Sequence, residues 1–247
     1  MNKESILGIK VSVTSYEDLK NCINEDIKNN KKSFIVAINP EKILKARKDK
    51  KLKKLLNNAD YQIPDGIGVI YASKLQKGQI KSRITGIDCM EMLCEESALK
   101  GYKIFLYGAK KEAINEAKKK LEEKYNHIKI VGTMDGYEKD NEKIIKAVNK
   151  SKADIIFVAL GSPKQENWII DNKDKVCAKI FQGVGGSFDV ISGNIKRAPK
   201  WMQNMGLEWL YRLIKEPKRI FRQIKLIKFL GLVVFRRNAW NYVIINI

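Results

Sequence analysis

Short apolar runs alternate with amphipathic stretches along most of the chain. The runs are rich in Ile, Val and Phe and predict strands at residues 33–38, 61–63, 102–108, 128–132, 153–160 and 179–185. Between them, residues 112–125 and 141–150 place apolar side chains at helical spacing, with lysines on the other side. Strands that alternate with helices of this length predict an α/β fold: a Rossmann-like, mostly parallel sheet with helices on both faces.

The pattern changes near residue 195. Residues 196–247 contain twelve Lys and Arg, only two acids, Glu208 and Glu216, and three of the four tryptophans. From Glu208 onward, apolar and aromatic side chains recur among the basic ones at helical intervals, and Pro217 is expected to divide the helix. We therefore expect an α/β core at 1–195 and a basic, amphipathic helical appendage at 196–247.

The formal net charge of +20 over 247 residues indicates an anionic partner. A polyanion, a phosphate-bearing substrate and an anionic membrane surface all fit, and so does a generally lysine-rich composition. The sequence has no recognised nucleic-acid-binding motif, so nucleic acid is not expected. A basic amphipathic helix with aromatic side chains is typical of a membrane-surface element, although a helix that packs on its own sheet domain has the same pattern.

The cysteines and the one histidine do not suggest a metal site. Four cysteines lack CxxC spacing, and His127 is expected at the surface. We expect no zinc, no disulfides and a reducing cytosolic compartment. The longest uninterrupted apolar run, residues 229–235, has seven residues, whereas a membrane-spanning helix needs about 20. No stretch near residue 1 is apolar enough for a secretory signal.

Small and polar residues follow the predicted strands. They form the loops Asn39-Pro40, Pro64-Asp65-Gly66, Gly108-Ala109, 133–137, 161–166 and 186–189. Ligands of an open parallel sheet bind beyond the carboxyl ends of its strands, where small residues let a ligand approach the backbone. Glycines can also simply end strands, but six such loops favour a binding pocket.

Several common catalytic motifs are absent from the sequence. Residues 183–188 read GVGGSF, which fails the dinucleotide pattern GxGxxG because Phe188 stands at the third glycine. The chain also lacks a GxxxxGK[ST] phosphate loop and an Asp-x-Asp pair for a nucleotide-bound divalent ion, and its single histidine disfavours a Ser-His-Asp triad. Carboxylates on or near the loops remain as acid–base candidates: Asp65, Asp88, Asp135 and Asp189.

Two of these carboxylates have more than one interpretation. Asp88 is expected to be the N-cap of a helix that begins near Cys89. Asp65 could cap a helix that starts at Gly66, or it could act as a general base. In a half-apolar site the pKa of a carboxyl group rises, and the carboxylate can accept the proton of an attacking hydroxyl.

Seven stretches, in this order, resemble the WecG/TagA/CpsF family of glycosyltransferases over nearly the whole chain. They are NPEKI (39–43), PDGIGV (64–69), RITGID (83–88), LYGA (106–109), GSPKQE (161–166), GGSFDVISG (185–193) and RAPKWMQNMGLEWLYRLIKEPKR (197–219). The resemblance is closest to TagA-like members. It implies inverting transfer of N-acetylmannosamine from a UDP donor to GlcNAc-diphospho-undecaprenol, a polyprenyl diphosphate lipid, in wall teichoic acid synthesis.

The same resemblance implies roles for single residues. Asp65 matches the family's proposed general base, Asn39 a residue near the donor sugar, and Gln165 a polar residue of the same pocket. Asp189 and the Gly136-Tyr137 turn match positions that hold the uridine. In one departure from the family pattern, Ala37 stands where many relatives have threonine, so any role of that hydroxyl is absent here or filled by another group.

Arginines or backbone N–H groups are expected to stabilise the departing UDP, because no acidic pair is present to bind a divalent ion. Arg83 lies in the stretch that matches the family and is expected at the diphosphate or the acceptor. In the appendage, Arg212, Arg219 and Arg222 share one helical face with Lys215. No cofactor or metal is expected, and the enzyme is expected on the cytoplasmic face of the membrane, as a possible homo-oligomer.

Two other functions remain open at the level of sequence. One is a non-catalytic scaffold that binds a nucleotide or a membrane and in which Asp65 only caps a helix. The other is a Rossmann-type enzyme that uses a dinucleotide.

Overall fold

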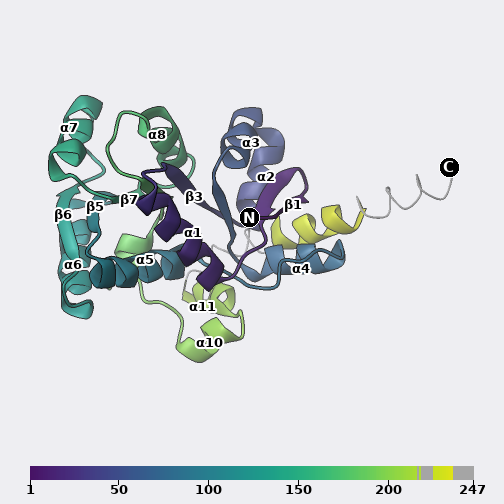
Figure 1. Ribbon diagram of the computed structural model, residues 1–247. Helices are drawn as coiled ribbons and strands as arrows, with labels where there is room; N and C mark the ends of the chain where they lie inside the picture. Colours follow the sequence, from purple (N-terminus) through teal and green to yellow (C-terminus); the bar gives the residue numbers. More distant parts are fainter. Residues whose placement is uncertain (216, 218–224, 236–247) are drawn as a thin grey trace.

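A computed structural model describes residues 1–215, 217 and 225–235 (Figure 1). Its centre is a sheet of six strands in the order β4-β3-β8-β7-β5-β6, and each neighbouring pair is parallel. The strands are β3 (Ser33–Ile38), β4 (Tyr61–Pro64), β5 (Lys103–Gly108), β6 (Lys129–Met134), β7 (Ile155–Ala159) and β8 (Ile180–Gly183). This confirms the predicted α/β fold and its six strands.

Helices cover both faces of the sheet, as predicted. One face carries α1 (Tyr16–Lys28), α5 (Gly86–Lys100), α6 (Lys111–Lys124) and α9 (Ser187–Ile191). The other carries α2 (Pro40–Lys48), α3 (Lys50–Asn57), α4 (Ile67–Leu75), α7 (Asn141–Ser151) and α8 (Lys164–Asn172).

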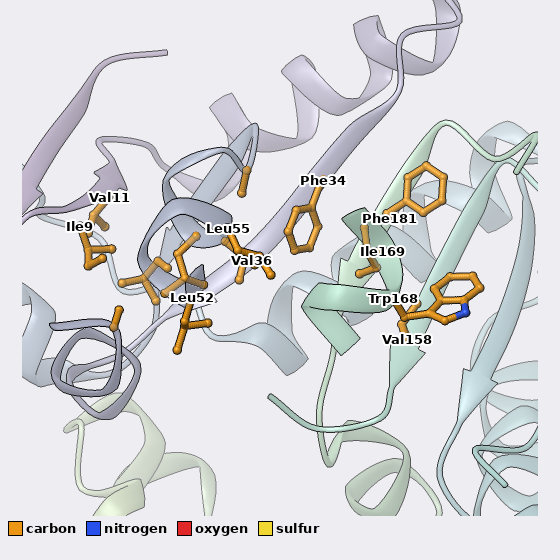
Figure 2. Close-up of a cluster of buried hydrophobic side chains, with 14 of the residues drawn as sticks. Ile9, Val11, Phe34, Val36, Leu52, Leu55, Val158, Trp168, Ile169 and Phe181 are labelled. Carbon is orange, nitrogen blue, oxygen red and sulfur yellow. The ribbon is translucent and has the colours of Figure 1, made fainter. Parts of the chain in front are cut away.

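Alternate residues of a strand supply the two layers of the core. In β3, Phe34 and Val36 belong to the cluster under α2 and α3, whereas Ile35 belongs to the cluster under α1 and α5. Figure 2 shows Phe34 and Val36 between Leu55 of α3 and Ile169 of α8. Because both faces are buried, the strands read as continuous apolar runs in the sequence.

An N-terminal hairpin was not predicted. Strands β1 (Lys3–Ile6) and β2 (Ile9–Ser12) pair in antiparallel register around Leu7-Gly8, whose φ angles are +50° and +86°. Two positive φ angles are the geometry of a type I′ turn, which suits a two-residue hairpin and favours glycine. The signal in the sequence was Gly8 between two short alternating runs.

Helix α5 begins earlier than predicted, and Asp88 is not its N-cap. The N-cap is Thr85, whose hydroxyl oxygen accepts a hydrogen bond from the backbone N–H of Asp88 at 3.1 Å. The same hydroxyl donates to the Asp88 carboxylate at 2.6 Å. Because Thr85 already caps the helix, the carboxylate of Asp88 is available for a longer-range partner.

The C-terminal segment contains α10 (Lys200–Asn204), α11 (Glu208–Lys215) and a helix at 225–235. Helix α11 ends two residues before Pro217, as a proline break predicts. Arg219 and Arg222 lie outside the described residues. In the described part of the chain, no helix is both long and apolar enough to cross a bilayer.

The helix at 225–235 packs against the main core. Phe229 and Val233 are fully buried in the cluster that contains α2 and α4, while Ile227 and Phe235 on the opposite side are exposed. Figure 1 shows this helix, in yellow, beside α4. For one face of this segment, the amphipathic pattern therefore reflects packing on the chain's own α/β domain. Removing residues 196–247 would remove part of the core as well as the appendage.

We expect Phe229→Ala to lower the free energy of unfolding by about 3–5 kcal/mol, because it leaves a cavity at a fully buried position. Phe235→Ala is the matched control on the exposed side of the same helix and should change it by less than about 0.5 kcal/mol. Urea unfolding of both variants measures the difference. Equal stability of the two variants would show that this helix does not belong to the cooperative core.

Candidate active site

A cavity of about 540 Å³ opens at the carboxyl ends of β4, β3, β8 and β7. Its wall is built from the loops that follow these four strands, from residues 83–87 before and in α5, and from Gly206, Glu208, Trp209, Lys225 and Leu226 of the C-terminal segment. A cavity of this size suits a small ligand such as a sugar nucleotide. Its position is where an open parallel sheet binds ligands.

Asn39 enters the cavity from the end of β3 and is the N-cap of α2. Its side-chain oxygen accepts a hydrogen bond from the backbone N–H of Lys42 at 2.9 Å, which holds its side chain at the cavity wall. Pro40 at the first helical position provides the φ angle that starts the helix. The helix N-terminus therefore faces the cavity, with its positive end toward any anionic ligand.

Lys42 lines the cavity and forms a buried ion pair with Glu166. The Lys42 Nζ lies 2.7 Å from Glu166 Oε1 and also donates to the carbonyl oxygen of Ala37 at 2.9 Å. Glu166 is fully buried. Its Oε2 atom has no hydrogen-bond partner among the described residues. The pair joins the first turn of α2, which follows β3, to the first turn of α8, which follows β7.

Gln165 is buried at the floor of the cavity and positions the glycines after β8. Its Oε1 accepts a hydrogen bond from the backbone N–H of Gly185 at 2.9 Å, and its Nε2 donates to Glu166 at 3.1 Å. A Cβ atom at Gly183 would lie 2.6 Å from Gln165 Nε2, so no larger residue fits there without displacing that amide. The two residues thus fix the backbone of the loop.

Asp65 lies half-buried on the cavity wall, directly after β4. Its backbone N–H donates to the carbonyl oxygen of Ile38 at 2.8 Å, which continues the pairing of β4 with β3. The N-cap position of α4 belongs to Gly66, whose φ of +90° strongly favours glycine. Asp65 is therefore not the N-cap of α4, and that interpretation of the residue was wrong.

Arg83 also lines the cavity, at the edge formed by the C-terminal segment. Its Nη2 donates to the carbonyl oxygen of Gln203 at 3.3 Å and lies 3.9 Å from Glu208 Oε2. Glu208 begins α11, so these contacts hold the appendage against the cavity. Arg212 lies in the middle of that helix.

Asp88 and Arg197 join α5 to the start of the appendage. Arg197 Nη1 lies 2.6 Å from Asp88 Oδ1, and Arg197 Nε lies 3.6 Å from Glu208 Oε1. Burial alone would raise the pKa of Asp88. Hydrogen bonds from Arg197 and Thr85, together with the positive charge of Arg197, outweigh the effect of burial and lower that pKa. The ion pair is therefore a charged anchor for the segment that supplies one wall of the cavity.

None of the three predicted uridine residues lines this cavity, and two of them lie far along the sheet from it. Gly136 and Tyr137 follow β6, at the opposite edge of the sheet from β4, and the Gly136 backbone N–H donates to the carbonyl oxygen of Ala109 at 2.8 Å. Tyr137 is exposed. Asp189 lies in α9, close to cavity residues Ser187 and Val190 but not itself among the lining residues. Their role in binding uridine stays a prediction.

The structure thus brings together Asn39, Asp65, Arg83 and Gln165, from four separate stretches of the sequence. Sequence reasoning assigned no role to Lys42, Glu166 or Arg197. Lys42 and Glu166 lie in two of the stretches that resemble the family. Nothing in the local sequence of either stretch indicates that these two residues, 124 positions apart, form an ion pair. Among the described residues, no group of three or more His, Cys, Asp or Glu side chains is arranged to hold a metal ion.

Two comparisons with known proteins relate the chain to a family of glycosyltransferases. A family model described as "Glycosyl transferase WecG/TagA/CpsF family" matches residues 4–242. Over 197 residues, the chain is 41% identical to a Bacillus subtilis (strain 168) protein named N-acetylglucosaminyldiphosphoundecaprenol N-acetyl-beta-D-mannosaminyltransferase. This match covers 80% of the chain and 77% of the relative. The match to the family model extends from β1 through the described C-terminal helix.

The Asp88–Arg197 pair predicts a pH dependence of stability. A carboxyl group whose pKa is lowered on folding stabilises the fold above its unfolded pKa of about 3.9, and this contribution is lost as the pH falls through the folded value. At pH 7, Asp88→Asn should lower the free energy of unfolding by about 2 kcal/mol. The difference from the unaltered protein should shrink below about pH 4. A difference that stays constant down to acid pH, measured by urea unfolding, would contradict this role.

Proposed function

Because the chain belongs to the WecG/TagA/CpsF family of glycosyl transferases, we propose that it transfers N-acetylmannosamine from UDP-N-acetylmannosamine to GlcNAc-diphospho-undecaprenol. The family makes the protein a glycosyltransferase. The name of the 41% identical relative supports the sugar and the lipid acceptor. The observation that carries the proposal is a cavity at the carboxyl ends of parallel strands with Asp65 on its wall, beside Asn39 and Arg83.

In the proposed reaction, Asp65 is the general base. Its carboxylate accepts the proton of the acceptor hydroxyl as that oxygen attacks the anomeric carbon of the donor sugar. The bond from the anomeric carbon to the phosphate oxygen breaks, and UDP leaves with the electron pair. A single displacement of this kind inverts the anomeric configuration. The half-buried position of Asp65 after β4 supports this role, because a base on a cavity wall can reach a bound hydroxyl.

The departing diphosphate requires positive charge. Arg83 and Lys225 line the cavity, and the N-terminus of α2 points into it behind Asn39. We assign leaving-group stabilisation to these groups together with Arg212, Arg219 and Arg222 of the appendage. Asn39 would contact the donor sugar. Gln165 would hold the cavity floor, and Asp189 and the Gly136-Tyr137 turn would bind the uridine. In this proposal no metal ion takes part.

The acceptor is anchored in a membrane, and the appendage has a surface that suits one. Large apolar side chains are exposed on α10, directly after it, on α11 and on the helix at 225–235: Trp201, Met205, Trp209, Ile214, Ile227, Val234 and Phe235. Basic residues lie among them in the sequence, such as Lys200, Lys215 and Lys228. Exposed aromatic and basic side chains of this kind favour the interface of an anionic bilayer. We propose peripheral binding to the membrane that holds the acceptor.

The substitution Asp65→Asn tests the base directly. It keeps the size of the side chain but removes the proton acceptor, so kcat should fall by about 100-fold to 10,000-fold. UDP binding, measured by calorimetry, should change little, because the expected contacts to UDP come from other residues. Transfer is measured by mass spectrometry with UDP-N-acetylmannosamine, its gluco epimer and a short-chain GlcNAc-diphospholipid. Undiminished transfer by the variant would refute the role of Asp65, and no transfer by the unaltered protein would refute the proposed reaction.

Removal of divalent ions tests how the leaving group is stabilised. We expect the transfer rate to stay within about twofold after exhaustive treatment with EDTA, because cationic side chains take the place of a metal ion. Arg83→Ala in the same assay should lower kcat/KM by about 100-fold. A rate that collapses with the chelator and recovers with added magnesium or manganese would show that the enzyme uses a metal after all.

A further inference from the structure

Helices α2 and α3 carry a dense group of basic side chains that the proposed reaction does not use. Within residues 45–54, seven Lys and Arg are exposed, and the one acid in this range is Asp49. We name this group the α2–α3 basic patch; it consists of Lys45, Arg47, Lys48, Lys50, Lys51, Lys53 and Lys54. The carboxylate of Asp49 is already engaged, because it accepts the backbone N–H of Leu52 at 2.9 Å as the N-cap of α3.

The charge of the patch is not balanced by neighbouring acids. Among the described residues, none of its seven side chains forms an ion pair. Helix α6 has a similar number of lysines but a different arrangement. There, Lys118 and Lys119 lie 3.8 Å and 3.9 Å from Glu122 and Glu123, one turn further along the helix. The patch is therefore a local excess of positive charge and not only a result of the lysine-rich composition.

The apolar positions of these helices explain why the basic residues all face solvent. Leu52, Leu55 and Leu56 of α3 and Ile43 and Ala46 of α2 are buried in the main core. Figure 2 shows Leu52 and Leu55 pointing into that cluster. With their apolar sides fixed in this way, the two helices present one basic surface outward.

The start of α2, one turn before the patch, contacts a helix that exposes apolar side chains. The helix at 225–235 is joined to α2 by Lys225, whose Nζ lies 3.6 Å from Glu41 Oε1. Leu226 of the same helix and Pro40 of α2 both border Gly68 of α4. On its outer side this helix exposes Ile227 and Phe235, at 74% and 75%. Basic side chains and exposed apolar side chains on adjoining helices are typical of a protein that binds a lipid interface.

We propose that the α2–α3 basic patch is a second membrane contact, on the catalytic core itself, that binds anionic phospholipid headgroups. This inference rests on the proposed function, since it assumes a lipid-anchored acceptor. Helix α2 begins at the cavity wall and is about 14 Å long at 1.5 Å per residue. A bilayer that lies along α2 and α3 therefore reaches close to the cavity. The patch would orient the opening toward the lipid diphosphate, and the appendage would supply the apolar contacts.

Two full-length triple variants test the proposal. The patch variant carries Lys48→Gln, Lys51→Gln and Lys54→Gln, and the control carries Lys111→Gln, Lys118→Gln and Lys119→Gln on α6. Each lowers the formal net charge of +20 by three, to +17. Co-sedimentation with vesicles of phosphatidylcholine, with and without phosphatidylglycerol, measures the partition coefficient. Unfolding midpoints of both variants are compared with that of the unaltered protein to show that all three are folded.

Each basic residue at an anionic leaflet raises the partition coefficient by about fivefold. We therefore expect the patch variant to bind phosphatidylglycerol vesicles roughly 100-fold less tightly, and the control variant to bind them about as well as the unaltered protein. An equal loss in both variants, or no loss in the patch variant, would overturn the proposal. So would a patch variant that loses binding to single-stranded RNA but keeps its binding to vesicles.

A separate assay distinguishes this proposal from the proposed function. With a water-soluble, short-chain GlcNAc-diphosphate acceptor, the patch variant should transfer sugar at the rate of the unaltered protein, because its three positions do not line the cavity. If the unaltered protein transfers no sugar but binds vesicles through the patch, the proposed reaction fails and the membrane contact stands. If transfer is normal and the patch variant binds vesicles normally, only the membrane contact fails.

Discussion

The architecture depends on one constraint, which is that a parallel sheet must bury both of its faces. The inner strands β3, β5 and β7 are apolar and buried on both sides, so the crossovers have to lay helices on both faces. Each helix returns the chain to the amino ends of the strands before the next strand begins. All six strands therefore have their carboxyl ends on the same side of the sheet, and the loops that follow them are brought together there. The cavity results from this arrangement, since four neighbouring strands supply its wall.

Buried polar contacts keep those loops at a fixed distance from one another. The Lys42–Glu166 pair connects the first turns of α2 and α8, and Gln165 connects α8 to the glycines after β8. A buried charge without its partner is strongly unfavourable, so Lys42 and Glu166 have to be buried as a pair. The Asp88–Arg197 ion pair likewise holds the start of the C-terminal segment in place beside the cavity. The site is therefore held by a small number of charged contacts within an apolar domain.

The C-terminal segment contributes to the fold as well as to the site. Phe229 and Val233 complete the core under α2 and α4, while Trp201 and Trp209 remain exposed. One face of the segment thus behaves as an ordinary core helix, and other parts present an apolar and basic surface. In the proposed function, that surface and the charges of α2 and α3 would hold the transferase at the membrane of its acceptor, which would account for the strongly basic composition.

The sequence by itself determined the fold class and the six strands, and its resemblance to the family pointed to four residues that the structure places on the cavity wall. Strand and helix periods are local, and small and polar residues that follow a buried strand mark a loop at the binding edge. Only the tertiary structure decided that Thr85, and not Asp88, caps α5, and that Gly66 stands at the N-cap of α4. The partners of Lys42 and Asp88 are more than 100 residues away in the sequence. Such pairs depend on how elements pack in three dimensions, and no local pattern encodes that packing.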